Sequence, residues 1–355
     1  MNYEKSIAYL EDLQQFGIQL GLERVICLLE LMGNPHKGLK YIHVAGTNGK
    51  GSTVSFLASI LKHSGYRVGV YTSPHLLRFN ERITIQETAS LEDEIPDEDI
   101  VRLTEQITNY IESSCLQVTY FEATTAIAFA YFAEKQPDFV ILEVGLGGRL
   151  DATNVIIPQV SIITNISLEH TAVLGNTIEE IAVEKAGIIK QGIPVVCGVM
   201  DEKALSTIKN IAEERHAPLH TVTHTAEYGL YPYKLSDIHL SLPGAHQLQN
   251  AACAVLAAEV LEGQGVKIND SQIPFALAHT CWPGRLQVIE QKPLIIVDGA
   301  HNPAGARVLR QAINDCFTYD QLILVLGILD DKDQTVMMRE LIADNQRLKL
   351  LILTK

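Results

Sequence analysis

The chain has 355 residues, of which 47% are hydrophobic and 20% charged, a balance typical of a globular protein that buries a large core. Its formal net charge of −14 argues against general binding to nucleic acid or to anionic membranes, although a local basic pocket can still hold an anionic ligand. No apolar run reaches the ~20 residues of a membrane-spanning helix, and the N-terminus is amphipathic and unlike a signal sequence. Six cysteines without a CxxC pair favour reduced thiols in a cytoplasmic protein.

The first predicted strand ends in a glycine-rich turn. The strand spans Tyr41–Ala45, the turn spans Gly46–Thr53, and apolar residues then recur at helical spacing. A strand, a glycine-rich turn and a helix in this order place backbone N–H groups around a phosphate at the helix N-terminus. Lys50 adds a mobile positive charge, and the hydroxyl of Ser52 or of Thr53 can bind Mg²⁺. A tight turn without a ligand would explain the glycines but not Lys50 and Ser52 together, so the pattern predicts a phosphate site.

Polar residues also follow or end other predicted strands. Ser73 lies on the loop after one strand, Glu143 interrupts the apolar run of another near its end, and His170 lies just past a third. These strands span Tyr66–Tyr71, Phe139–Val144 and Val160–Asn165. The carboxyl ends of parallel strands meet at the ligand-binding edge of an open α/β sheet. A salt bridge is the simple alternative for Glu143, and a plain loop position for His170, but beside a phosphate loop we favour Mg²⁺ binding.

Three other residues each have a structural and a functional interpretation. Lys185 lies in an apolar stretch of the predicted helix Thr177–Ile189, where it is either a surface lysine or a desolvated, neutral amine. Arg82 is either a solvated loop charge or an anion clamp. Asn250, in the predicted helix His246–Leu261, either hydrogen-bonds within the fold or contacts a base edge. The residues alone leave these alternatives open.

The order of the elements predicts two α/β domains. Strands that alternate with crossover helices over residues 1–281 favour a doubly wound parallel sheet, with a β-rich flap over about residues 220–242. Residues 282–293 have the proline and glycine content of a linker, and a smaller α/β unit begins at residue 294. The final run, residues 348–355, is predicted to be the third strand of that unit. We therefore expect residues 294–355 to form an incomplete domain.

Motifs spread along the chain together resemble one family. They are GTNGKGS (Gly46–Ser52), YTSPHL (Tyr71–Leu76), NERI (Asn80–Ile83), EVGLGGRLDATN (Glu143–Asn154), KAGI (Lys185–Ile188), WPGR (Trp282–Arg285) and DGAHNP (Asp298–Pro303). From about residue 41 to residue 333, and in the same order, the chain resembles the folylpolyglutamate synthase/dihydrofolate synthase family, which belongs to the Mur-ligase-like ATP-dependent amide ligases. As a set, these motifs are far more specific than the phosphate loop alone.

The resemblance implies a large P-loop-type domain with a doubly wound parallel sheet and a smaller Rossmann-like α/β domain, truncated because family members continue past the end of this chain. It also implies a reaction in which ATP phosphorylates a carboxylate to an acyl phosphate. The amino group of L-glutamate then attacks, which gives an amide, ADP and phosphate. The acid would be dihydropteroate or the (poly)glutamate tail of a reduced folate, and the stretch around Arg149 and Asp151 resembles the bifunctional bacterial type. We expect a monomer.

The functional residues of the family carry over motif by motif. The residues expected to bind ATP are Asn48, Gly49, Lys50, Gly51, Ser52, Asn250, Arg285 and Asp298. Two Mg²⁺ sites are implied, which share Glu143 and also use Ser52, Ser73 and His170. Catalytic roles fall to Lys50, to His301 and to Lys185, which the family carbamylates with CO₂. The folate side would be contacted by Arg82, Phe121 and Asp151.

Two other functions compete with this one. The first is a different Mur-type ligase that adds amino acids to a cell-wall precursor, and the second is an inactive, truncated nucleotide-binding remnant. The YTSPHL and DGAHNP motifs argue against the cell-wall ligase. A bare P-loop switch would explain neither Lys185 nor the stretch around His301. We therefore expect an ATP-dependent ligase that joins glutamate to a folate or its precursor.

Overall fold

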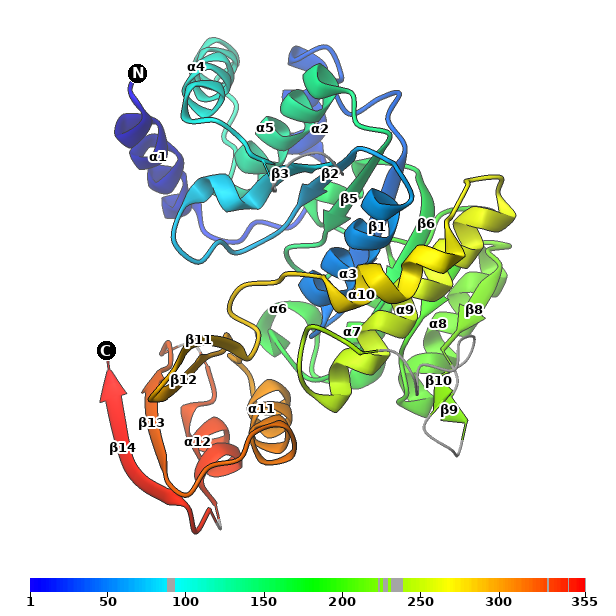
Figure 1. The fold of residues 1–355 in the computed structure, drawn as a ribbon. Helices are drawn as coiled ribbons and strands as arrows, with labels where there is room; N and C mark the ends of the chain where they lie inside the picture. The colour runs from blue at the N-terminus through cyan, green and yellow to red at the C-terminus, as the bar shows by residue number, and fades with distance from the viewer. Residues whose placement is uncertain are drawn as a thin grey trace.

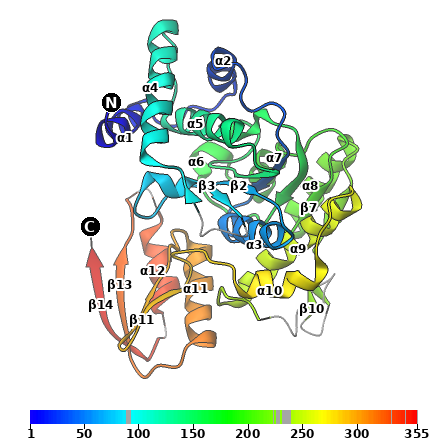
Figure 2. The ribbon, with the colours of Figure 1, turned by 45° about the horizontal axis from the view of Figure 1, so that its top comes forward.

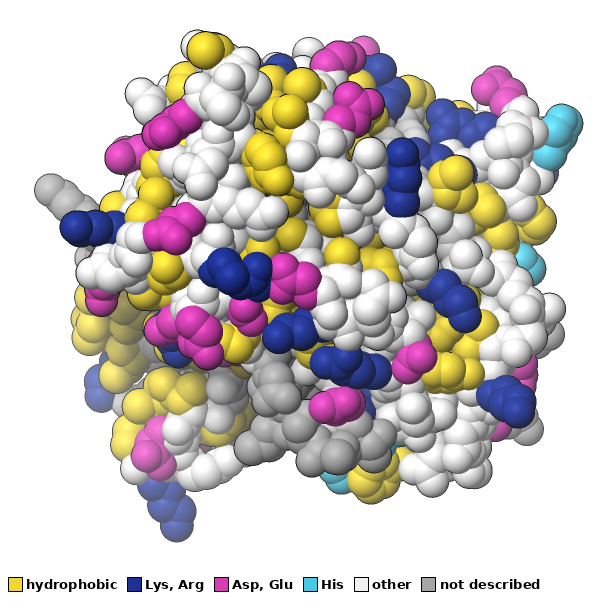
Figure 3. Space-filling model, turned by 90° about the horizontal axis from the view of Figure 1, so that it is seen from above, with side chains coloured by type: hydrophobic (Ala, Val, Ile, Leu, Met, Phe, Trp, Pro, Cys, Tyr) yellow, Lys and Arg dark blue, Asp and Glu magenta, His cyan; other side chains and the backbone are white. Residues whose placement is uncertain are grey.

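The computed structural model describes residues 1–87, 93–222, 224–225, 229–230, 239–330, 332–343 and 345–354. The chain forms a large lobe, residues 1–281, and a small lobe, residues 282–355, which is orange to red in Figure 1. No helix in the described part combines the length and the apolar character needed to cross a bilayer. On the face seen in Figure 3, basic and acidic side chains are interspersed and do not merge into one basic surface.

Eight of the described strands form one sheet in the large lobe, in the order β4-β3-β2-β5-β1-β6-β7-β8. Neighbours from β2 to β8 pair in parallel, whereas β3 and β4 are antiparallel at one edge. The bounds are β1 Tyr41–Ala45, β2 Val68–Tyr71, β3 Ile83–Gln86, β4 Asp93–Glu94, β5 Phe139–Glu143, β6 Pro158–Ile163, β7 Val195–Cys197 and β8 Leu219–Thr221. The predicted doubly wound parallel sheet is confirmed.

Helices cover both faces of this sheet (Figure 1), which is why its central strands are continuous apolar runs. In β1, Ile42 and Val44 face the core under α3, α9 and α10, whereas Tyr41 faces the core under α1, α2, α4 and α5. The helices are α1 Tyr3–Asp12, α2 Glu23–Leu31, α3 Lys50–His63, α4 Asp97–Ser114, α5 Tyr120–Lys135, α6 Thr171–Leu174, α7 Ile178–Ala186, α8 Glu202–Glu214, α9 Ala245–Gly263 and α10 Ile273–Ala278. Short 3-10 helices span Leu13–Phe16, Phe79–Arg82, Ala152–Val155 and Asp270–Gln272.

The small lobe packs two helices against one side of a parallel strand pair (Figure 2). The strands are β13, Leu322–Gly327, and β14, Leu348–Thr354, and the helices are α11, Pro303–Cys316, and α12, Gln334–Ile342. Their core is formed by Ala306, Met337 and Leu341. The three predicted strands of this unit are all present, since β12 spans Leu294–Val297.

Two expected segments differ from the structure. The linker expected over residues 282–293 contains a strand, β11, Gln287–Gln291, which pairs antiparallel with β12. A turn at Lys292-Pro293 connects the two strands, and β11 was missed because it is short, largely polar and flanked by turn residues. The flap expected over residues 220–242 lies mostly outside the described residues. Within the part that the structure describes, β9, His224–Thr225, pairs antiparallel with β10, Gly229–Leu230.

Candidate active site

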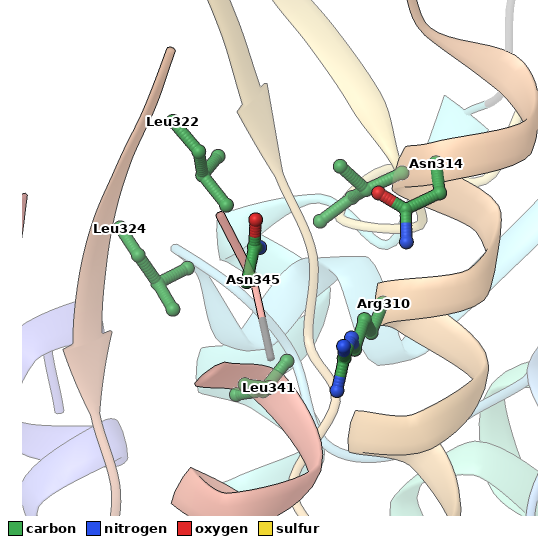
Figure 4. A pocket seen from close by; sticks show the side chains of 7 residues that line it. Arg310, Asn314, Leu322, Leu324, Leu341 and Asn345 are labelled. Carbon is green, nitrogen blue, oxygen red and sulfur yellow. The ribbon is translucent and has the colours of Figure 1, made fainter. Parts of the chain in front are cut away.

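A cavity of about 730 Å³ lies between the lobes, at the carboxyl edge of the large sheet. The large lobe contributes the loops that follow β1, β2, β5 and β6 and the start of α9, and the small lobe contributes the turn after β12 and the start of α11. A second cavity lies between α11, α12 and β13 in the small lobe (Figure 4). Its volume is about 10 Å³. That volume holds one water molecule at most, so the cavity between the lobes is the candidate site.

The cavity brings together most of the predicted site residues. Every residue predicted to bind ATP lines it, as do the predicted metal ligands and the catalytic candidates Lys185 and His301. These residues come from strand ends that are far apart in the sequence, and the parallel sheet aligns them at one edge.

The phosphate loop connects β1 to α3. Gly49 is the N-cap of α3 and has a φ of 80°, a left-handed conformation that favours glycine. A Cβ atom at Gly51 would lie 2.5 Å from the Trp282 ring, which explains why glycine stands where a hydroxyl residue commonly follows the lysine of such loops. Lys50 folds back over the loop, because its Nζ donates to Gly46 O and Thr47 O, both at 3.1 Å.

Lys185 reaches the same loop from α7. Its side chain is 4% exposed, and its Nζ donates to Gly46 O at 2.9 Å, the carbonyl that Lys50 also contacts. Burial, followed by the charge of Lys50, lowers the pKa of Lys185 to about 7. The surface-lysine interpretation is therefore wrong, and the site contains an amine that is neutral in a large fraction of molecules at neutral pH.

Glu143 ends β5 inside the cavity. Its Oε2 accepts a hydrogen bond from the Ser73 backbone N–H at 3.1 Å. Burial raises the pKa of Glu143, although Lys50 and the Ser73 hydrogen bond oppose that change. Its carboxylate and the Ser52 and Ser73 hydroxyls are the hard oxygen donors that Mg²⁺ prefers. Within the described residues no three His, Cys, Asp or Glu side chains converge as a metal group, so a bound ion would depend on further oxygens, such as those of a phosphate.

His170 lines the same cavity as these oxygen donors. It precedes α6 with a φ of 50°, a conformation that few residues other than glycine adopt. Burial lowers the pKa of His170; Glu169 opposes this, whereas Lys332, Lys185 and Lys50 add to it. The imidazole is therefore favoured in its neutral form, the form that can bind a metal.

The small lobe contributes a hydrogen-bonded turn. Asp298 accepts from Leu286 N at 2.9 Å and from Ala300 N at 2.8 Å, so its carboxylate shapes the turn that presents His301. Arg285 lies beside the same turn, against Gly299. On the large lobe, Asn250 donates to Gln247 Oε1 at 2.9 Å and lies against Gly49 of the phosphate loop.

The three residues predicted to contact the folate side are not among the described residues that line the cavity. Arg82 is buried, where its Nε donates to His75 Nδ1 at 2.8 Å. Phe121 packs against Gly145, a residue of the cavity wall. Asp151 accepts from Leu146 N at 2.8 Å and from Thr153 N at 3.0 Å. Phe121 and Asp151 thus contact the cavity wall at Gly145 and Leu146, whereas Arg82 bonds to His75, which is not among the lining residues.

Sequence reasoning missed two residues that contact each other across the cavity. Asn302 Nδ2 donates to Glu169 Oε1 at 2.8 Å, so the two lobes touch at this point. Although burial raises the pKa of Glu169, hydrogen bonds from His301 and Asn302 and the charge of Lys50 outweigh it and hold that pKa at about 2. The only signal in the sequence was position: Glu169 precedes a predicted ligand, and Asn302 lies inside the DGAHNP motif.

Comparison with known proteins now identifies the family. The model of the Mur ligase middle domain matches residues 44–258, and that of the Mur ligase, glutamate ligase domain, matches residues 284–355. A dihydrofolate synthase/folylpolyglutamate synthase of Bacillus subtilis is 41% identical over 360 residues, which cover 96% of this chain and 82% of the relative. The chain belongs to the folylpolyglutamate synthase/dihydrofolate synthase family. Like its relatives in this family of Mur ligases, it is an ATP-dependent glutamate ligase, as the motifs predicted.

Solved structures of this family have the same two-lobed fold. One described as an FPGS-AMPPCP-folate complex has a TM-score of 0.87 and 35% identity, and the match covers 100% of this chain and 90% of that chain. A structure of E. coli FolC in complex with DHPP and ADP has a TM-score of 0.83 and 35% identity, with 96% and 81% covered. These matches confirm the predicted fold class and enzyme class.

Proposed function

We propose that this ligase joins L-glutamate to dihydropteroate, to folate (poly)glutamates, or to both, through an acyl phosphate. The observation that carries the proposal is the cavity between the lobes, where the phosphate loop, Glu143 and the buried amine of Lys185 face Arg285 and His301. Relatives crystallised with AMPPCP and folate, or with DHPP and ADP, support the choice of substrates.

The triphosphate of ATP is held by the phosphate loop. The backbone N–H groups of Gly49, Lys50 and Gly51 lie at the N-terminus of α3, where the helix dipole favours an anion. Lys50 is free to turn from the loop carbonyls to a phosphate, since both kinds of partner are acceptors. Asn250 lies toward the adenine, and Arg285 and Asp298 of the small lobe complete the nucleotide site.

Ser52, Glu143, Ser73 and His170 would hold two Mg²⁺ ions between them, with Glu143 shared. Bound Mg²⁺ would neutralise the charge of the transferring phosphoryl group and of the acyl phosphate. The hydroxyls and carboxylate fit this ion, and the lack of a larger cluster of His, Cys, Asp or Glu among the described residues fits a site completed by phosphates and water.

Lys185 is carbamylated in the active enzyme. Its neutral Nζ attacks CO₂, an N–C bond forms as one C=O π pair moves to oxygen, and the N–H proton leaves to solvent, so that a neutral amine becomes an anionic carbamate. The low pKa of Lys185 supports this step, because only the deprotonated amine is a nucleophile. The carbamate would then balance the charge of Lys50 and the metals.

We further propose that the lobes act as domains, residues 1–281 and residues 282–355, and that their closure assembles the site. The boundaries of the two family matches support this division. Arg82, Phe121 and Asp151 would approach the pterin-bearing substrate if the wall at Gly145 moves aside when that substrate binds.

The test is ADP formation by the purified chain with ATP, L-glutamate and either dihydropteroate or tetrahydrofolate. We expect ADP only when glutamate and one of these acids are both present, because the acyl phosphate needs both partners to turn over. A nucleotide-sugar peptide serves as the control acid for a cell-wall ligase. Turnover with that acid alone, or no turnover with any acid, contradicts the proposal.

A further inference from the structure

We propose that Glu169 and Asn302 form a clasp that joins the lobes and holds the phosphate loop in its nucleotide-binding position. Both are positioning residues for the ligase reaction: they act through the loop and through His301 and do not touch a reacting atom. The inference rests on the proposed function only in that the nucleotide bound by the loop is ATP.

The clasp converges on one carboxylate oxygen of the large lobe. Glu169 Oε1 accepts from Asn302 Nδ2 at 2.8 Å and lies 3.3 Å from His301 Nε2. The Glu169 side chain is 10% exposed and Asn302 is 4% exposed, so the hydrogen bond between them is shielded from water, whereas the His301 side chain is 51% exposed. Two consecutive residues of the small lobe thus meet a single acceptor of the large lobe.

The same geometry places His301 between two acceptors. Its Nδ1 lies 2.9 Å from Gly299 O, and its Nε2 lies 3.3 Å from Oε1 of Glu169. His301 therefore contacts the large lobe at the same carboxylate as Asn302.

Asn302 uses the full hydrogen-bonding capacity of its amide. Its Oδ1 accepts from Gly305 N at 2.8 Å, which caps α11, and from Asn48 Nδ2 at 3.3 Å. Its Nδ2 donates to Asn48 Oδ1 at 2.9 Å and to Glu169. The residue is 4% exposed. Only a carboxamide offers two donors and two acceptors at this size, so neither aspartate nor serine can replace it.

The contact with Asn48 transmits the clasp to the phosphate loop. The Asn48 backbone N–H donates to Asn165 Oδ1 at 2.8 Å, and its carbonyl accepts from Thr164 Oγ1 at 2.7 Å. Asn48 is therefore fixed on three sides, immediately before Gly49. Docking of the small lobe and the nucleotide-binding shape of the loop favour each other, which is a coupling between closure and nucleotide binding.

The decisive variant is Asn302→Asp. It keeps the shape and the cap of α11, since aspartate is a good N-cap, but it removes both donors and places a second carboxylate against Glu169. We expect the KM for ATP to rise about 10- to 100-fold, with the thermal midpoint close to that of the wild type. Asn314→Asp, at the exposed far end of the same helix, adds the same charge and serves as the control, with an unchanged KM.

The double variant Asn302→Asp/Glu169→Gln tests the pairing itself. The amide introduced at position 169 can donate to the carboxylate introduced at position 302, so the double variant recovers a large part of the ATP affinity that Asn302→Asp loses. If the two substitutions acted independently, their losses of ATP affinity would add in the double variant. A double variant no better than Asn302→Asp overturns the clasp, as does an Asn302→Asp variant with a wild-type KM.

A readout without turnover separates this proposal from the proposed substrates. Trp282 is the single tryptophan of the chain and packs against Gly51, so its fluorescence reports the start of α3. We expect AMPPCP to change the Trp282 emission in the wild type. The change should be much smaller in Asn302→Asp and should largely return in the double variant. Equal changes in all three overturn the clasp. If the wild type shows this fluorescence pattern but has no activity on dihydropteroate or folates, the proposed substrates are wrong and the clasp is still supported.

Discussion

The two walls of the cavity are built differently. The large-lobe wall centres on one short stretch, Gly46–Ser52, whose shape comes from local glycine geometry and from Lys50 folding over its own loop. The small-lobe wall reaches the site through contacts between residues far apart in the sequence, such as Glu169 with Asn302, which are 133 positions apart. The phosphate loop is therefore shaped within one short stretch, whereas completion of the site depends on how the lobes meet.

The variant with the largest expected effect is Lys50→Ala, which tests the large-lobe wall. Lys50→Ala should lower turnover by about 1,000-fold, because the developing phosphoryl charge loses its nearest cation. Circular dichroism and the thermal midpoint should remain close to the wild type, since the side chain donates only to loop carbonyls. Normal ADP formation by the variant would remove Lys50 from the site.

Lys185→Ala tests whether the second amine acts through a carbamate. We expect turnover to fall by about 100-fold or more and to recover in part when formate or acetate is added, because a small carboxylate can replace the carbamate. Lys190 is the matched control: it is a lysine with a lowered pKa that donates to Asn154 O away from the cavity. The carbamate proposal would be contradicted if formate or acetate raised the turnover of Lys190→Ala in the same way. It would also be contradicted if Lys185→Ala were fully active without an added carboxylate.

The pH dependence of carbamylation follows from the same residue. The pKa of Lys185 is lowered to about 7, so its amine is protonated and unreactive below that pH and neutral above it. The initial rate of ¹³CO₂ uptake at constant dissolved CO₂, followed by NMR, should fall about tenfold for each pH unit below the pKa and level off above it, because that rate follows the fraction of neutral amine. A midpoint near the ordinary lysine value would show that burial and Lys50 do not act as inferred.

Asp151→Asn separates support of the wall from contact with substrate. The carboxylate accepts two backbone N–H groups, and an amide would turn one acceptor into a donor facing them. We expect a loss of about 1–3 kcal/mol in the free energy of unfolding, measured by urea denaturation. A KM for dihydropteroate that rises while the KM for ATP stays constant would add the predicted substrate role, and unchanged values of both would leave only the structural one.

Much of this fold and its candidate site could be predicted from short stretches of the sequence. The phosphate loop, the polar residues at strand ends and the crossover helices are properties of short stretches, so the doubly wound sheet and the edge that holds Ser73, Glu143 and His170 could be predicted. The hairpin of β11 and β12 was missed, because its strands are short and one lies in a stretch rich in turn residues.

By itself the sequence determined the family, the sheet and the set of groups that we propose bind nucleotide, because each depends on residue types at fixed spacing. Only the tertiary structure decided which amine is desolvated and what Glu169 contacts. Burial and the distance to Lys50 set the pKa of Lys185. Docking of the small lobe pairs Glu169 with His301 and Asn302. Electrostatics and hydrogen bonding depend on distances in space, and a linear pattern does not contain those distances.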